Sequence, residues 1–480
     1  MMYRPTIGLE VHAELKTRTK MFCDSANDPD EMRPNINVCP VCMAHPGTLP
    51  IINQEAVKHI MRIGTAIKGK IADFSEFDRK SYFYPDIPKG YQISQYEHPF
   101  ISGGELLGVA ITRVHLEEDT ARSIHTAGKS LVDFNRAGIP LMELVTEPVL
   151  KDAETAGRFA RELQLLLRTL GASEANLEKG EMRIEANISV SADESKFGTK
   201  VEVKNINSFR SVERAIAFEI ERQIALLETG GKVAQETRGW DETKQVTFHQ
   251  RFKEGSADYR YFPEPDLPKL FLSEISEFSS EKLEAALPEL PWERRARYES
   301  LGVRKEYVGV LIQPENKFIN DLFENVIKNA SNNNNTTLIS LAANYIVSDI
   351  VGLMQDDTNA PEPASTPDAM DFSKGFSKLM RMIQEGDVSS RGAKDILVRL
   401  YRAGGDPELI AKEHGLIQSH DAEVLLSAIR EVLKEEVRAV EEYRVGKAAA
   451  LQYLIGKSMK ATKGAGNPAM LKDLIIKEIA

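Results

Sequence analysis

The sequence contains little cysteine and tryptophan, with three Cys and two Trp among 480 residues. Three cysteines are too few for a disulfide scaffold and favour a reducing compartment, so we expect a cytoplasmic protein. No run of eighteen apolar residues occurs, and no apolar segment precedes the first strand-like region. We therefore expect neither a membrane span nor a secretory signal.

An excess of positive charge is also missing. The chain has 61 Lys and Arg against 72 Asp and Glu, for a net charge of −11. This balance excludes a protein that coats nucleic acid through its overall charge, but it leaves a local basic surface open. The length and the 42% hydrophobic content predict a folded protein of two to four domains.

The familiar nucleotide-binding loops are absent. Two segments, 128–130 and 456–458, read Gly-Lys-Ser like the end of a P-loop. The glycine that such a loop requires five residues earlier is replaced by Ser123 and Leu451. If the protein uses ATP, it binds ATP outside this framework.

Alternation and helical spacing predict the elements of the first half. Residues 6–15, 182–190 and 199–204 alternate apolar and polar side chains, which is typical of half-buried strands. Residues 152–170 and 209–229 have apolar residues at helical spacing and are followed by glycine. The strand-like and helix-like segments together indicate an α+β domain.

The composition changes after the Pro-rich segment 287–291, beyond which helical patterns dominate. We therefore predict an α+β protein with an N-terminal antiparallel-sheet domain at 1–292. An all-α domain is expected at 293–410, and a small all-α tail at 411–480.

Acidic side chains recur on the strand-like segments. Glu10, His12 and Glu14 share one strand face, with neighbours roughly 7 Å apart. Other acids occupy similar runs, namely Glu117, Glu118, Glu143 and Glu185. Carboxylates with one His suit Mg²⁺ or Mn²⁺ and are also compatible with Zn²⁺. The alternative is a solvated sheet face, although Glu143 is flanked by apolar residues and is costly to bury unpaired.

The three cysteines form a second candidate site. Cys39 and Cys42 are spaced as C-x₂-C, and Cys23 precedes them by sixteen residues. His45 continues the motif, so the four residues could close a Cys₃His zinc site. Three reduced thiols beside a turn are the alternative.

Two loops combine aromatic and basic residues. Residues 78–100 contain Lys80 and Lys89 among several tyrosines and prolines, and 258–266 are similar. Such a mixture suits the unstacked end of a nucleic acid, although a packed loop of Tyr and Pro explains it equally well.

The C-terminal segment 445–480 reverses the charge of the chain. It contains six Lys and two acids, for a net charge of +4. Lys457, Lys460 and Lys463 lie beside glycines and suit a phosphate backbone, which favours RNA binding. A solvated helix face is the alternative.

Six segments together resemble the B subunit of the bacterial aspartyl/glutamyl-tRNA(Asn/Gln) amidotransferase. They are 7–15, 77–86, 114–119, 133–141, 205–209 and 258–266. Residues 456–463 resemble the YqeY-like tail of that family. The resemblance implies a cradle-like catalytic domain, a helical domain and a tRNA-binding tail.

The resemblance also implies a reaction. The side-chain carboxylate of Glu-tRNA(Gln) or Asp-tRNA(Asn) is phosphorylated with ATP and Mg²⁺. Ammonia that the amidase (the A subunit) releases from glutamine then forms the amide, so the protein would be a carbon–nitrogen ligase. The small C subunit completes the implied heterotrimer. A non-catalytic tRNA-binding scaffold is the main alternative, and a metal-dependent phosphohydrolase is a weaker one.

The family positions map onto residues of this chain. The implied catalytic residues are Glu10, His12, Glu118, Glu143 and Glu185. The same five with Glu117 are the implied Mg²⁺ ligands, and Lys80, Arg183 and Lys204 the expected nucleotide-binding residues. Two positions depart from the family: Glu185 stands where Asp is usual, and Ser25 stands where zinc-binding members have Cys. We therefore expect His45 to supply the fourth zinc ligand.

Overall fold

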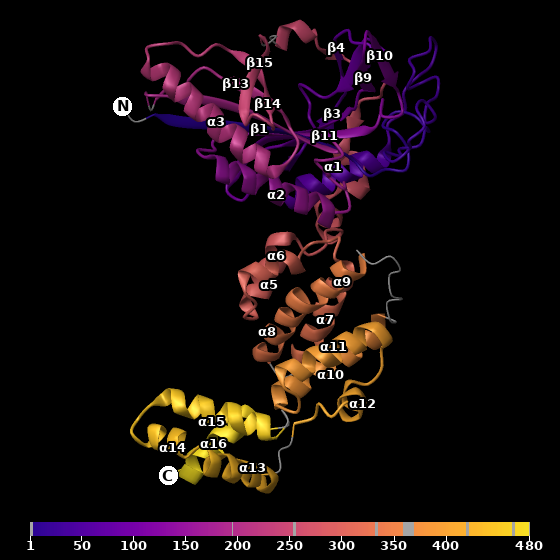
Figure 1. The fold of residues 1–480 in the computed structure, drawn as a ribbon. Helices are drawn as coiled ribbons and strands as arrows, with labels where there is room; N and C mark the ends of the chain where they lie inside the picture. The colour runs from indigo at the N-terminus through magenta and orange to yellow at the C-terminus, as the bar shows by residue number, and fades with distance from the viewer. Residues whose placement is uncertain are drawn as a thin grey trace. The chain divides into compact units, whose positions relative to one another are not determined.

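The computed structural model describes residues 3–193, 195–252, 256–331, 335–358, 369–418, 422–462 and 466–479. The chain separates into two compact units, Met1–Pro291 and Trp292–Ala480 (Figure 1). The first unit mixes strands and helices, and the described part of the second is helical. The finer division of the second unit at residue 410 stays a prediction.

A ten-stranded sheet forms the centre of the first unit. Its order is β15-β14-β13-β12-β1-β11-β8-β6-β2, and β7 pairs with β8. The strands are β1 (Arg4–Glu14), β2 (Lys70–Ile71), β6 (Ile101–Ser102), β7 (Glu105–Leu106), β8 (Val109–Glu118), β11 (Pro140–Thr146), β12 (Met182–Ser191), β13 (Val201–Ile206), β14 (Glu236–Asp241) and β15 (Val246–Phe252). The pairings are antiparallel apart from β13 with β14, which is parallel and corrects the purely antiparallel expectation. The predicted strands correspond to β1, β12 and β13.

Alternation along β1 gives the sheet an apolar face and a polar face. Ile7, Leu9 and Val11 are at most 1% exposed, so they face the core. Three helices belong to this core: α1 (Gln54–Ala66), α2 (Ala153–Thr169) and α3 (Phe209–Glu228) (Figure 1). Because neighbouring side chains on a strand point to opposite faces, Glu10 and His12 are directed away from that core.

The predicted helices begin at side-chain caps. Asp152 accepts a hydrogen bond from the Thr155 backbone N–H at 2.7 Å, and Ser208 accepts one from the Ser211 backbone N–H at 3.1 Å. Each cap satisfies a backbone donor that the first helical turn leaves free. The predicted ranges 152–170 and 209–229 are thus confirmed as α2 and α3 within a residue or two.

Smaller sheets complete the first unit. A three-stranded sheet has the order β16 (Phe262–Pro263), β4 (Asp78–Ser81) and β5 (Tyr91–Ser94), and β5 contacts β8 of the main sheet. Two-stranded pairs are β3 (Phe74–Ser75) with β17 (Leu270–Phe271) and β9 (Arg122–Thr126) with β10 (Lys129–Asp133). The short helices are η1 (Ser256–Tyr259), η2 (Leu272–Glu274), η3 (Ser276–Phe278) and α4 (Ser280–Ala285). The three-stranded sheet brings the two aromatic loops of the sequence together.

The second unit is built from helices throughout its described part. They are α5 (Pro291–Ser300), α6 (Lys305–Leu311), α7 (Lys317–Ser331), α8 (Thr336–Tyr345), the π-helical η4 (Ile346–Ile350), α9 (Val351–Thr358), α10 (Ala369–Glu385), α11 (Ser390–Ala403), α12 (Pro407–Glu413), α13 (Ala422–Glu435), α14 (Val437–Arg444), α15 (Ala448–Ala461) and α16 (Pro468–Ile479). The last four share a core that includes Leu425, Leu454 and Ile475. This core lies within the predicted tail 411–480.

One continuous helix, Thr336–Asp356, is long and apolar enough to cross a membrane by length and composition alone. It comprises α8, η4 and most of α9, and α8 packs against α7 and α10. Ile339, Ile346 and Ile350 are at most 1% exposed. Because one side of the helix is already covered by protein, we interpret it as a core helix of the second unit.

Candidate active site

The polar face of the main sheet brings the predicted acids together in rows. His12 on β1 lies opposite Arg183 on β12 and Glu143 on β11, and Glu143 lies opposite His115 on β8. In the next row Glu10 lies opposite Glu185. Directly opposed residues have Cβ atoms about 5 Å apart. Strand register therefore gathers side chains that lie far apart in the sequence.

His12 lies at the centre of this acidic cluster. Its Nε2 is 3.4 Å from Glu143 Oε2, 3.5 Å from Glu117 Oε1 and 4.0 Å from Glu10 Oε1. His12 and Glu143 each expose less than a sixth of their side chains. The carboxylates are thus close enough to share one cation with the imidazole.

Three groups of potential cation ligands overlap along the rows. They are Glu10–His12–Glu143, His115–Glu117–Glu143 and Glu10–Glu185–Glu202, and the ligand atoms within each lie within 4.8 Å of one another. Glu10 and Glu143 each belong to two groups. Carboxylate oxygens with an imidazole form a donor set that fits Mg²⁺ or Mn²⁺.

The electrostatics of the cluster reflect crowded, buried acids. Burial raises the pKa of Glu10 to about 7, and the nearby charges of Glu143 and Glu185 add to this effect. Burial also raises the pKa of Glu117. Although burial opposes it, the hydrogen bond and charge of Glu143 raise the pKa of His12 to about 9. The cluster therefore holds a protonated imidazole as a counter-charge, in a place where a divalent cation would relieve the same repulsion.

Positive side chains border the acidic cluster. Lys204 Nζ lies 2.7 Å from Glu185 Oε2, and Arg113 Nη2 lies 3.3 Å from Glu143 Oε1. Burial opposes charge on Lys80, yet Glu117 and Glu143 raise its pKa. Arg183 forms an ion pair with Asp119. The predicted nucleotide-binding residues Lys80, Arg183 and Lys204 therefore all lie around the cluster, where cations can bind phosphate oxygens.

Glu118 departs from the predicted ligand set. It follows Glu117 on β8, and successive residues of a strand point to opposite faces. Its Oε1 pairs with Lys89 Nζ at 2.5 Å and accepts a hydrogen bond from the Ile93 backbone N–H at 2.9 Å. Among the described residues, none of the candidate cation groups includes Glu118. The structure therefore separates Glu118 from the cluster that it was expected to join.

Two residues of the cluster were missed by the sequence analysis. His115 is 2% exposed, and its Nε2 lies 3.5 Å from Glu143 Oε2. Glu202 shares a candidate group with Glu10 and accepts a hydrogen bond from Thr237 Oγ1 at 2.7 Å. The sequence did contain a signal for both residues. His115 stands two positions before Glu117 and therefore on the same strand face, and Glu202 stands between two buried valines.

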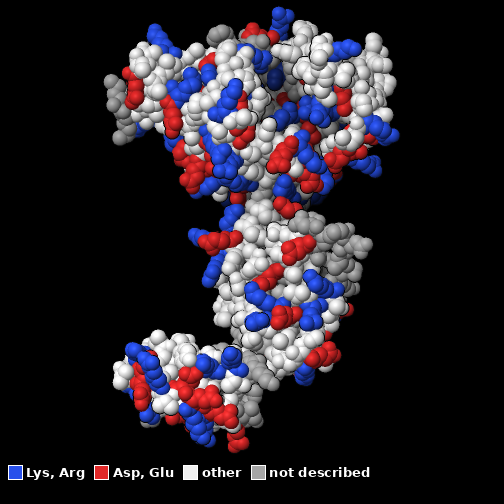
Figure 2. All heavy atoms as spheres, in the orientation of Figure 1, with Lys and Arg blue, Asp and Glu red and all other residues white. Residues whose placement is uncertain are grey.

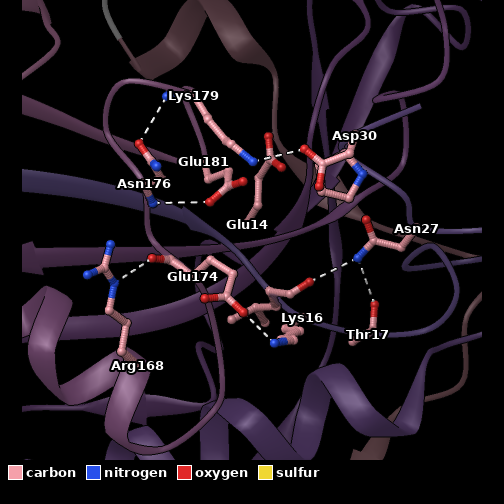
Figure 3. A pocket seen from close by; sticks show the side chains of 12 residues that line it. Glu14, Lys16, Thr17, Asn27, Asp30, Arg168, Glu174, Asn176, Lys179 and Glu181 are labelled. Carbon is pink, nitrogen blue, oxygen red and sulfur yellow. Dashed lines mark hydrogen bonds and ion pairs between the residues drawn. The ribbon is translucent and has the colours of Figure 1, made fainter. Parts of the chain in front are cut away.

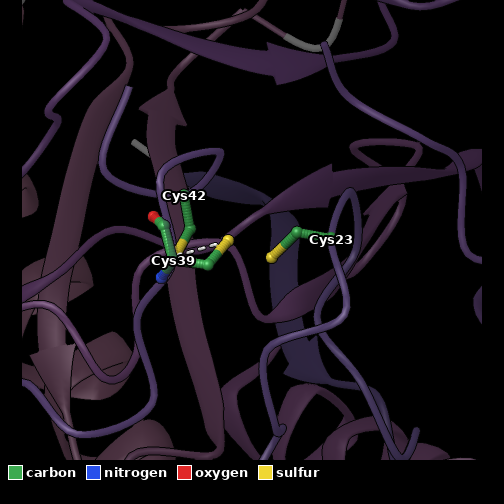
Figure 4. Close-up of side chains that lie close together, drawn as sticks. All are labelled: Cys23, Cys39 and Cys42. Atoms are coloured by element: carbon green, nitrogen blue, oxygen red, sulfur yellow. Dashed lines mark hydrogen bonds between the residues drawn. The ribbon is translucent and has the colours of Figure 1, made fainter. Parts of the chain in front are cut away.

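The three cysteines converge in a separate cluster (Figure 4). The sulfur atoms of Cys23, Cys39 and Cys42 lie within 4.8 Å of one another, and Cys39 Sγ and Cys42 Sγ are 3.8 Å apart. The hydrogen bond from Cys23 lowers the pKa of Cys42 to about 4 against the effect of burial. The fully buried Lys20 has its Nζ 3.7 Å from Cys42 Sγ. Two thiols and a thiolate this close together could hold a thiophilic metal such as zinc.

The structure does not bring His45 into the cysteine cluster. In the described chain, no His or acid shares the group of ligand atoms formed by the three sulfurs. Ser25 instead places its Oγ 3.8 Å from Cys42 Sγ. The expected Cys₃His set is corrected on this point: His45 lines a pocket together with Cys23 and Cys42, but its ring does not join the three sulfur atoms.

A cavity of about 600 Å³ opens beyond Glu14, at the end of the polar rows (Figure 3). Its charged lining residues largely pair with one another: Lys179 Nζ lies 2.9 Å from Asp30 Oδ1, and Lys16 pairs with Glu174. We assign no ligand to this cavity.

The tail surface carries both signs of charge (Figure 2). Lys457 Nζ lies 2.6 Å from Glu436 Oε1, and the exposed Lys460 lies in the last turn of α15. Lys463 lies outside the described residues. Residues 421–444 contain seven acids and four bases, so the basic segment 445–480 is partly neutralised by its neighbours in the same bundle.

Known protein families match most of the chain. Residues 5–276 match the GatB/GatE catalytic domain, and residues 321–479 match the GatB domain. The chain is 42% identical to a protein of Thermomicrobium roseum, with 99% of this chain and 98% of the relative aligned. It is 41% identical to one of Thermus thermophilus (100% and 99% aligned) and 40% identical to one of Gloeothece citriformis (99% and 98% aligned). All three carry the name of the B subunit of aspartyl/glutamyl-tRNA(Asn/Gln) amidotransferase.

Proposed function

Because the chain belongs to the family of aspartyl/glutamyl-tRNA(Asn/Gln) amidotransferase B subunits, we propose that its acidic cluster activates the side-chain carboxylate of a misacylated tRNA with ATP. The protein is the catalytic subunit in tRNA amidation, a ligase that forms a carbon–nitrogen bond with nitrogen from glutamine. The single observation that carries the proposal is the cluster of partly buried Glu10 and His12 with buried Glu117 and Glu143, bordered by cations. A non-catalytic scaffold would not require this cluster.

The chemistry explains why the two charge types are adjacent. A carboxylate is a poor electrophile toward ammonia, so the γ-phosphoryl group of ATP is first transferred to a carboxylate oxygen, which releases ADP. Ammonia then attacks the carbonyl carbon and phosphate leaves, which yields Gln-tRNA(Gln) or Asn-tRNA(Asn). Lys80, Lys204 and Arg183 would neutralise phosphate oxygens during the first step.

Glu10, Glu117 and Glu143, with His12 once it has released its proton, are the residues that would hold Mg²⁺. A bound Mg²⁺ would neutralise charge on the transferring phosphoryl group and align it with the substrate carboxylate. Glu185 reaches Lys204 in this structure, so we assign it the role of orienting that lysine beside Glu10. Glu118, turned toward Lys89, acts outside the cation site.

The remaining proposals rest on the family. We propose that the chain works in the cytoplasm with the amidase A subunit and the small C subunit. Residues 411–480, with Lys457, Lys460 and Lys463, would contact tRNA. Cys23, Cys39 and Cys42 would bind zinc, with Ser25 rather than His45 nearest the fourth position.

Reconstitution tests the proposed reaction. The chain, its partner subunits, misacylated tRNA, ATP, Mg²⁺ and glutamine should together form amidated tRNA. Glu143→Gln removes a charge shared by two candidate ligand groups, so we expect at least about a 100-fold loss of ATP-dependent activation. Glu55→Gln, an exposed acid on α1, is the matched control. Activation that survives in Glu143→Gln would refute the site.

A further inference from the structure

An aromatic pocket adjoins the acidic cluster and is not used by the proposed reaction steps. It has a volume of about 300 Å³ and lies where β4 and β16 meet. The lining residues come from both aromatic loops of the sequence, namely Asp78, Tyr96, Glu97, Arg260, Tyr261, Phe262 and Pro263. This volume is at the lower end for pockets that bind small ligands.

The aromatic rings of the pocket are stacked and yet accessible. Tyr96 and Tyr261 lie 4.3 Å apart at an angle of 12°, and Tyr96 and Phe262 are each 45% exposed. A protein normally buries such rings, so a stacked pair with an open outer face is a platform for a further planar ring. Stacking of this kind is how proteins bind unpaired nucleotide bases.

The polar groups of the pocket also suit a nucleotide. The Asp78 carboxylate accepts a hydrogen bond from the Tyr96 backbone N–H at 2.8 Å, which holds the stacked ring beside an acid. Arg260 adopts φ 48°, a left-handed backbone conformation that is uncommon for residues other than glycine. Among the described residues, Arg260 has no ion-pair partner, so its cation is available to a ligand.

Lys80 connects this pocket to the acidic cluster. Asp78 and Lys80 are two residues apart on β4, and therefore point to the same side about 7 Å apart. Lys80 Nζ lies 5.1 Å from the ring centre of Tyr259, which contacts Tyr261 edge-on. A base in the pocket would thus place its ribose toward Lys80 and its reacting end toward Glu117 and Glu143.

We propose that Tyr96, Arg260, Tyr261 and Phe262 form an adenine-binding pocket. The inference rests on the proposed function, because both of its substrates present adenine: ATP carries it, and tRNA ends in a 3′-terminal adenosine. The pocket binds this ring by stacking and by contacts from Asp78 and Arg260. It thereby directs the attached phosphate or aminoacyl ester along Lys80 to the acidic cluster.

Binding ratios in the assembled amidotransferase test this pocket and identify the source of the adenine. One arm compares a non-hydrolysable ATP analogue with tripolyphosphate, both with Mg²⁺. The other compares tRNA ending in CCA with tRNA that lacks the terminal adenosine. Tyr96→Ala and Phe262→Ala should each reduce the preference for the adenine-containing ligand about 5- to 140-fold in one arm. A loss in the first arm assigns the pocket to ATP, and a loss in the second assigns it to the tRNA end.

Two controls keep the proposal falsifiable. Tyr96→Phe retains the ring and should restore the preference, and Phe197→Ala, which removes a ring that is 72% exposed elsewhere, should leave it unchanged. Unchanged ratios in both alanine variants would overturn the proposal, and so would a loss that Tyr96→Phe fails to restore. These ratios require no turnover, so a wild-type complex that bound both ligands but formed no amidated tRNA would refute the proposed function alone.

Discussion

Within the acidic cluster, each carboxylate lies at most 4.0 Å from a lysine or histidine nitrogen. Glu143 lies within 3.5 Å of His12, His115 and Arg113, so it has three basic side chains as close partners. We expect Mg²⁺ to stabilise the protein by about 2.7 kcal/mol at a concentration of about 100 Kd. Glu143→Gln should abolish this gain, as measured by the rise of the melting temperature with Mg²⁺. A full Mg²⁺ response in the variant would contradict the assigned ligands.

His12 makes stability depend on pH when no divalent cation is present. Its pKa in the folded protein is about 9, above the ordinary value of 6.5, because Glu143 and other acids favour the charged ring despite burial. The stabilisation is therefore complete below pH 6.5 and is lost as the pH rises through 9. In EDTA, the melting temperature should fall more between pH 6.5 and 9 for the wild type than for His12→Gln. Parallel curves would show that His12 is not the group responsible.

Ser25 rather than His45 is the residue that limits the cysteine cluster. Ser25 Oγ is 3.8 Å from Cys42 Sγ, and His45 lies outside the group of three sulfurs. Ser25→Cys should therefore raise zinc affinity at least about tenfold, because a fourth thiolate closes a tetrahedral site. Zinc competition with a chelator measures the change. His45→Ala is the control and should match the wild type, and zinc loss in that variant would restore the Cys₃His set.

At the scale of elements, the last four helices share one apolar core. Leu454 on α15 is fully buried with Leu425 and Ile475. Leu454→Ala should destabilise this bundle by about 2–5 kcal/mol, since it leaves a cavity. Amides of α13–α16 should then lose at least about 30-fold in hydrogen-exchange protection. The tail should unfold independently, so the hydrogen-exchange protection of amides in the main sheet should be unchanged. Gln452→Ala, at an exposed position, is the control and should leave the protection of α13–α16 unchanged.

The pairing of strands brings the residues of the site together. The alternation at 6–15 and 182–190 was sufficient to predict two strands and the face on which Glu10, His12 and Glu185 lie. It could not predict that β1 lies between β11 and β12, because pairing partners are chosen by packing across the whole sheet. For the same reason, His115 and Glu202 stayed unassigned until the register placed them beside Glu143 and Glu10.

At the scale of the whole molecule, the net charge of −11 is unevenly distributed. The first unit buries several acids around the cluster, and the tail combines an acidic segment with a basic one. We expect deletion of residues 411–480 to weaken tRNA binding at least about tenfold and to leave ATP hydrolysis within a factor of about two. Filter binding and phosphate release measure the two quantities. Equal tRNA affinity of the intact and truncated chains would refute a tRNA-binding tail.

The α+β class, the strands β1, β12 and β13, the helices α2 and α3, the family and most residues of the acidic cluster could be predicted from the sequence. These follow from local periodicity and from motifs, which each segment carries independently of its neighbours. Only the tertiary structure determined which acidic side chains lie close to one another. Folding turned Glu118 away from Glu117, placed Ser25 Oγ near the Cys42 sulfur, and joined two aromatic loops, 78–100 and 258–266, into one pocket. The physical reason is that side-chain direction and strand register are set by packing between segments that lie far apart in the chain.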